Sequence, residues 1–169
     1  MTDQVDYRSA IKDFVGRPIP PEGELRVWLD DDPVDREAPE GWVHVRSARE
    51  ACFALLSGRV VELSLDNDLN NSCCHPDDSE EEIEKKTRQA DENLFGSGFQ
   101  VLDFLEEQHF ACGNPLWPRD GIAFHTANVS AERRMIRSIE AVANREGITY
   151  ELIRREGLRE RHRLLLEDQ

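Results

Sequence analysis

Three short apolar runs, each ending in acidic or imidazole side chains, constrain the fold of this chain more than any other feature. They are residues 27–29 before Asp30-Asp31, residues 60–65 before Asp66-Asn67-Asp68, and residues 121–124 before His125-Thr126. Short continuous apolar runs are typical of strands in a covered parallel sheet. We therefore expect three parallel strands with polar residues at their carboxyl ends.

Helical patterns alternate with these strands. Ser47 and Glu50 form a capping-box pattern, and Gly58 is placed to end the helix that follows. Two further helices are predicted over residues 99–108 and 131–143, and two further strands over residues 41–46 and 148–153. This alternation predicts an α/β fold with a parallel central sheet.

The expected domain covers residues 25–153, between an N-terminal extension (1–24) and an Arg-rich helical tail (154–169). Residues 33–40 are too few for a crossover helix, so the connection after the first strand is predicted to be a loop. An acidic insertion over residues 70–95 follows the third strand and is predicted to form a solvated surface helix, a lid or a partner surface.

Length and charge narrow the class of protein. A chain of 169 residues is one domain by the usual range of about 100–200 residues. Its formal charge of −14 argues against strong non-specific nucleic-acid binding, which needs clustered Lys and Arg. The sequence shows neither an apolar run of membrane-spanning length nor a signal pattern, so no membrane partner is expected. Four cysteines without framework spacing favour a reducing compartment, and we expect a cytoplasmic location.

The polar residues that follow the strands suggest a metal site. Carboxyl ends of parallel strands meet at one edge of a sheet, where ligands bind. Several carboxylates at that edge would repel one another unless a cation shares them, and hard oxygen donors suit Mg²⁺ or Mn²⁺. His125 is the side chain of this group whose ordinary pKa lies near neutrality, as proton transfer requires.

Simpler interpretations remain open for each cluster. An Asp run after a strand can be only a turn, and Asn128 can be an ordinary helix N-cap. Cys73, Cys74, His75, His109 and Cys112 could be imagined as zinc ligands, but adjacent cysteines do not match the usual spacing.

Several short segments together resemble the cyclic-phosphate processing receiver domains, a divergent family of the receiver fold of two-component signalling. The segments are Leu29-Asp30-Asp31, residues 41–46 with the helix after them, 63–69, 96–99, and 125–128 followed by Arg134-Met135. The resemblance covers about residues 25–143. It implies a receiver-like (flavodoxin-like) three-layer sandwich and an activity on cyclic phosphates, such as 2′,3′-cyclic RNA ends or cyclic nucleotides.

The resemblance also implies roles for individual residues. Asp30, Asp31, Asp66 and Asp68 would form the acidic metal-binding pocket, and His125 with Thr126 would stand where ordinary receivers carry a Ser or Thr. Asn128 and Arg134 match further family positions. Val129 and Ala131 replace the usual Pro and Gly of that loop. The chain also has no Lys after the fourth strand, which disfavours a phosphoacceptor receiver that uses Asp66.

These observations lead to one hypothesis and one alternative. The hypothesis is a metal-dependent phosphoesterase for a cyclic phosphate, which would be a small molecule or an RNA end. The expected ligands for Mg²⁺ or Mn²⁺ are Asp30, Asp31 and Asp66. The expected catalytic residues are His125, Asp66 and Asp68. The expected substrate-binding residues are Thr126, Asn128 and Arg134. The alternative is a non-catalytic receiver-like module that binds a ligand or a signalling partner.

Overall fold

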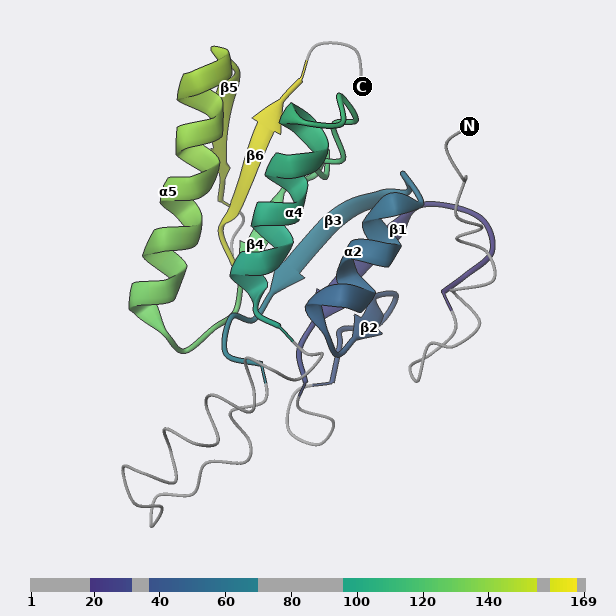
Figure 1. The fold of residues 1–169 in the computed structure, drawn as a ribbon. Helices are drawn as coiled ribbons and strands as arrows, with labels where there is room; N and C mark the ends of the chain where they lie inside the picture. The colour runs from purple at the N-terminus through teal and green to yellow at the C-terminus, as the bar shows by residue number, and fades with distance from the viewer. Residues whose placement is uncertain (1–18, 32–36, 70–95, 155–158, 167–169) are drawn as a thin grey trace.

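The computed structural model describes residues 19–31, 37–69, 96–154 and 159–166 (Figure 1). Its elements are β1 (Leu25–Leu29), β2 (Val43–Val45), α2 (Ala48–Leu56), β3 (Val60–Leu65), α4 (Gly98–Phe110), β4 (Ile122–Phe124), α5 (Val129–Glu146), β5 (Thr149–Ile153) and β6 (Arg161–Leu165). The five strands and three helices predicted between the first strand and residue 153 are all present. The α/β fold class is confirmed.

The six strands form one sheet in the order β2-β1-β3-β4-β6-β5. The first four strands are parallel, as predicted. β6 pairs antiparallel with β4 on one side and with β5 on the other, so the complete sheet is mixed.

The prediction of a helical tail after residue 153 is wrong for residues 161–165, which form β6. His162 and Leu164 are buried in this strand, whereas Arg161 and Arg163 are half-buried. This alternation has the period of two that a strand requires, and pairing on both sides satisfies the backbone of the segment.

All three described helices lie on one face of the sheet, where α4 packs between α2 and α5 (Figure 1). Leu25, Val27 and Leu29 of β1 are buried under this layer, while Arg26 between them is exposed and Trp28 is half-buried. The helices thus supply one outer layer of the predicted sandwich. Within the described residues, no helix covers the other face.

The connections agree with the predictions where they can be compared. The described part of the β1–β2 connection, residues 37–42, contains no helix. Residues 1–18 of the predicted extension and the whole predicted insertion lie outside the described residues. Ile19, by contrast, is buried in the core of the domain. None of the helices in the described part of the chain is both long and apolar enough to cross a bilayer.

Local capping explains where the helices begin. Ser47 accepts a hydrogen bond from the Glu50 amide at the start of α2, and Asn128 does the same for the Ala131 amide at α5. Ser97 and Gln100 form a complete capping box at the start of α4. The N-termini of α4 and α5 both follow strands, so they lie at the carboxyl edge of the sheet.

Candidate active site

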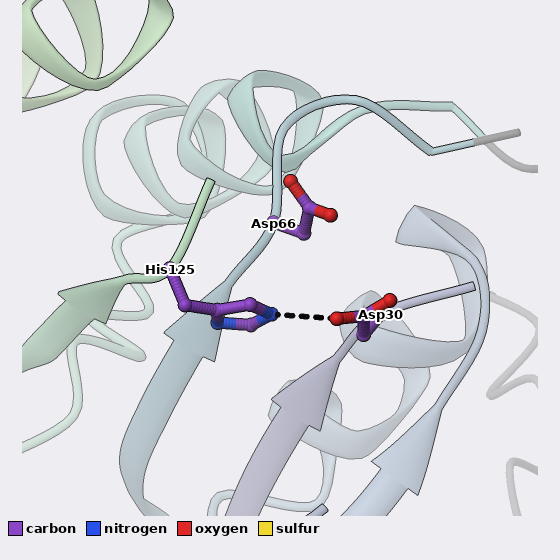
Figure 2. Close-up of side chains that lie close together, drawn as sticks. All are labelled: Asp30, Asp66 and His125. Atoms are coloured by element: carbon purple, nitrogen blue, oxygen red, sulfur yellow. Dashed lines mark ion pairs between the residues drawn. The ribbon is translucent and has the colours of Figure 1, made fainter. Parts of the chain in front are cut away.

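Three strand ends bring Asp30, Asp66 and His125 together at the carboxyl edge (Figure 2). One ligand atom from each residue lies within 4.8 Å of the others. Their exposed fractions are only 0%, 5% and 4%, respectively. Two carboxylates and an imidazole therefore share one small buried volume.

The register of the sheet explains this convergence. Trp28 is paired with Ser64, and Ser64 is paired with Ala123, across three neighbouring parallel strands. Side chains two positions apart in a strand point to the same face. Asp30, Asp66 and His125 each lie two positions after one of these paired residues, so they follow them on one face.

The backbone ladder continues beyond the strands and holds these residues in place. The Asp66 amide donates to the Leu29 carbonyl at 3.0 Å, and the His125 amide donates to the Leu65 carbonyl at 3.0 Å. The three residues are thus held by the sheet itself rather than by free loops.

The His125 ring is held on three sides. Its Nδ1 atom lies 2.8 Å from the Ser64 hydroxyl, and the ring stacks on Trp28 with centroids 3.9 Å apart and planes 11° apart. Its Nε2 atom faces Asp30, 3.3 Å from Oδ2. This places Nε2 on the side of the ring where both carboxylates lie (Figure 2).

The backbone of Asp66 lies directly against the start of α4. A Cβ atom on Gly98 would be only 2.4 Å from the Asp66 carbonyl oxygen, so the approach requires a glycine. The N-terminal end of a helix carries a partial positive charge that favours nearby anions. The positive end of α4 therefore lies against the backbone carbonyl of Asp66 at the carboxyl edge of the sheet.

Asp68 belongs to a second polar cluster. Its Oδ2 accepts from the Thr126 hydroxyl at 3.3 Å, and its Oδ1 accepts from the side-chain amides of Asn128 and Asn67 at 3.2 and 3.0 Å. The backbone N–H of Asn128 donates to the Thr126 hydroxyl oxygen. These bonds tie the segment after β3 to the β4–α5 connection, and both Asp68 oxygens already accept hydrogen bonds.

The remaining predicted site residues are placed elsewhere. Asp31 follows β1 and is half-buried, but it is not part of the converging group. The Arg134 guanidinium lies over the Phe99 ring, with Cζ 5.7 Å from the ring centroid. Arg134 therefore packs from the second turn of α5 against the first turn of α4.

Sequence reasoning missed three residues that build the site. Trp28 and Ser64 contact His125. The Nε2 atom of His44 lies 2.6 Å from the Asp30 carbonyl oxygen. Because a carbonyl oxygen only accepts, that His44 nitrogen carries the proton. A signal was available for two of them: Trp28 and Ser64 lie two positions before Asp30 and Asp66, on the same strand face.

The family assignment rests on most of the chain. The model of the cyclic-phosphate processing receiver domain matches residues 25–141, from β1 into α5. This chain belongs to that family. The matched region of this receiver domain contains every candidate site residue, whereas β5 and β6 lie beyond it. No curated protein and no solved structure gives a significant match to the chain.

Proposed function

We propose that this receiver domain is a metal-dependent phosphoesterase that opens a cyclic phosphate. The observation that carries the proposal is the convergence of Asp30, Asp66 and His125 at the carboxyl edge. Carboxylates buried this close together are costly unless a cation or a proton offsets their charge. The description of the family, cyclic-phosphate processing, supports a cyclic phosphate as the substrate.

Asp30 and Asp66 fit a divalent metal because each offers a buried carboxylate oxygen within 4.8 Å of the other ligand atoms of the group. A bound metal would supply Lewis-acid stabilisation of the charge that develops on the phosphoryl oxygens. We expect the N-terminus of α4 to add a favourable field for the substrate phosphate, because it abuts Asp66. Asp31 lies outside the converging group, so we give it no ligand role.

The residues of the second cluster would help to bind the substrate. Thr126, Asn128 and Asp68 hold one another at the start of α5, which orients the hydroxyl and amide groups. We propose that this cluster positions the β4–α5 connection against the phosphate, and that Arg134 would bind phosphate by leaving the Phe99 ring.

Two roles are available to His125 in this mechanism. It could donate a proton to the leaving oxygen, which is typically worth about 10²–10⁴-fold in rate, or it could bind the metal. Turnover depends on His125 in both cases. The two roles differ in whether metal binding also depends on it.

A substrate panel tests the proposal. The full chain would be assayed with 2′,3′-cyclic nucleotides, 3′,5′-cyclic nucleotides and RNA ending in a cyclic phosphate, each with and without Mg²⁺, Mn²⁺ or Zn²⁺. We expect metal-dependent turnover of one class and its loss in Asp66→Asn. Asp103→Asn is the matched control, because it removes the same charge from an exposed position of α4.

Binding without turnover would contradict the enzyme and favour the alternative, a receiver-like module that binds its ligand. To detect that outcome, the same panel would be measured by calorimetry, which reports affinity whether or not a bond is cleaved.

A further inference from the structure

We propose that His125 is a metal ligand through Nε2, and that the site of Asp30, Asp66 and His125 therefore prefers a divalent transition ion such as Zn²⁺ or Mn²⁺ to Mg²⁺. The inference rests on the metal site of the proposed function and specifies its chemistry. It departs from the proton-transfer role that the sequence suggests for this histidine.

The orientation of the ring is the first argument. Stacking on Trp28 at 3.9 Å fixes the plane of the ring, and the Ser64 hydroxyl at 2.8 Å from Nδ1 fixes its rotation within that plane. The His125 side chain is only 1% exposed. An imidazole that donates a proton to a substrate must be accessible to that substrate. An imidazole that binds a metal ion needs only a fixed orientation toward the ion.

The environment of Nε2 is the second argument. Among the described residues, this buried nitrogen makes no hydrogen bond, although Asp30 Oδ2 is only 3.3 Å away. A buried polar atom without a hydrogen bond costs about 1–3 kcal/mol, and the ion pair with Asp30 does not supply that bond. Two ligands about 2.1 Å from one ion lie roughly 3.0–3.4 Å apart at octahedral or tetrahedral angles. A shared metal ion accounts for both observations.

Ser64 completes the arrangement. A hydroxyl oxygen can accept a hydrogen bond from a protonated Nδ1, and this leaves the lone pair of the neutral imidazole on Nε2. Histidines that bind metals usually donate their other ring N–H to a fixed acceptor, which orients the ring. Ser64 is therefore a positioning residue for the metal ligand. It is itself only 2% exposed, so it is poorly placed to act on substrate.

The donor set decides the class of metal. Mg²⁺ prefers oxygen ligands and keeps several of its waters, so a buried imidazole suits it poorly. Imidazole suits Zn²⁺, and affinities of mixed nitrogen and oxygen sites rise from Mn²⁺ to Zn²⁺. The two carboxylates keep Mn²⁺ acceptable. We expect Zn²⁺ to bind most tightly, Mn²⁺ less tightly, and Mg²⁺ least.

Direct metal binding tests the proposal without substrate. Calorimetry on the full chain with Zn²⁺, Mn²⁺ and Mg²⁺ alone should give that order. His125→Gln should weaken Zn²⁺ and Mn²⁺ binding at least about tenfold, and Ser64→Ala by about 10–100-fold, as for other residues that orient metal ligands. Ser57→Ala, at the C-cap of α2, is the matched control for Ser64→Ala and should leave the affinity for each metal unchanged.

Pulsed EPR on the wild-type Mn²⁺ complex gives a second measurement that does not depend on a variant folding correctly. We expect a nitrogen coupling from a directly bound imidazole. Mn²⁺ bound without that coupling would overturn the inference, and metal-dependent turnover would then still support the proposed function with His125 as the proton donor. No binding of any of the three metals would overturn both.

Discussion

Replacing Gly98 with alanine tests how closely α4 and the site depend on each other. The added Cβ would lie 2.4 Å from the Asp66 carbonyl oxygen, 3.1 Å from the Asp66 carbonyl carbon and 3.3 Å from the Asn67 Cα. All three neighbours are backbone atoms, so no flexible side chain can move away. Cβ contacts below 3.0 Å essentially do not occur, so the helix or the strand end must shift by at least 0.6 Å.

The sign of the change in unfolding free energy shows whether helix propensity or the steric clash determines the stability of Gly98→Ala. Alanine is favoured over glycine by about 1 kcal/mol in a helix, so without the clash the variant would be more stable. Forcing a methyl group into a packed site costs about 1–3 kcal/mol. We expect the clash to prevail, with a net loss of up to about 2 kcal/mol of unfolding free energy. Metal binding should also weaken, because the carboxylate moves with its backbone.

Urea denaturation and metal calorimetry would measure both effects. Gly147→Ala is the control, because Gly147 has a φ of 66° and its Cβ would meet nothing within 4 Å. That substitution should cost about 1 kcal/mol through backbone strain alone and leave metal affinity unchanged. A Gly98→Ala protein as stable as wild type, with unchanged metal affinity, would refute the reasoning.

Three further outcomes follow from buried groups away from the site. Glu62→Gln should lower the free energy of unfolding by about 3–5 kcal/mol in chemical denaturation, because this carboxylate is 4% exposed and pairs with Arg161. Arg26→Gln removes the other partner of Glu62, which is 56% exposed, and should cost under about 1 kcal/mol. Equal losses in the two variants would contradict this. Burial raises the pKa of the Cys52 thiol to about 12, so a thiol reagent at about pH 8 should label the exposed Cys112 before Cys52, as peptide mapping would show. Burial lowers the pKa of His162 from 6.5, so its contribution to stability should be complete above pH 6.5 and be lost as pH falls toward the folded pKa. His162→Gln should flatten that part of the pH profile.

Local pattern was enough to predict every described helix and strand except β6, and the edge of the sheet where the site lies. Val60–Leu65 is uniformly buried, and its apolar pattern alone locates β3 and therefore Asp66 at its end. The capping pattern of Ser47 and Glu50 likewise marks the start of α2 without reference to the rest of the molecule, whereas the capping box of Ser97 was not predicted. These features depend on residues a few positions apart, so a single sequence contains them.

Features that depend on distant pairings could not be predicted in the same way. Only the position of β3 between β1 and β4 puts Asp30 with His125 and leaves Asp31 out of the group. The second cluster depends on a contact between Asp68 and Thr126, which are far apart in the chain. Both are consequences of strand order, which local periodicity does not encode.

The position of β6 has a consequence for how this chain folds as it is made. β5 leaves the ribosome before β6 and runs parallel to β4, so it could pair directly with the open edge of β4. The native sheet instead needs β6 between them, and pairing over a long chain separation is slow. The growing chain must therefore keep β4 and β5 apart until residues 161–165 emerge. An early β4–β5 pairing would be a kinetic trap, and the edge of β4 would be the surface on which a chaperone could act.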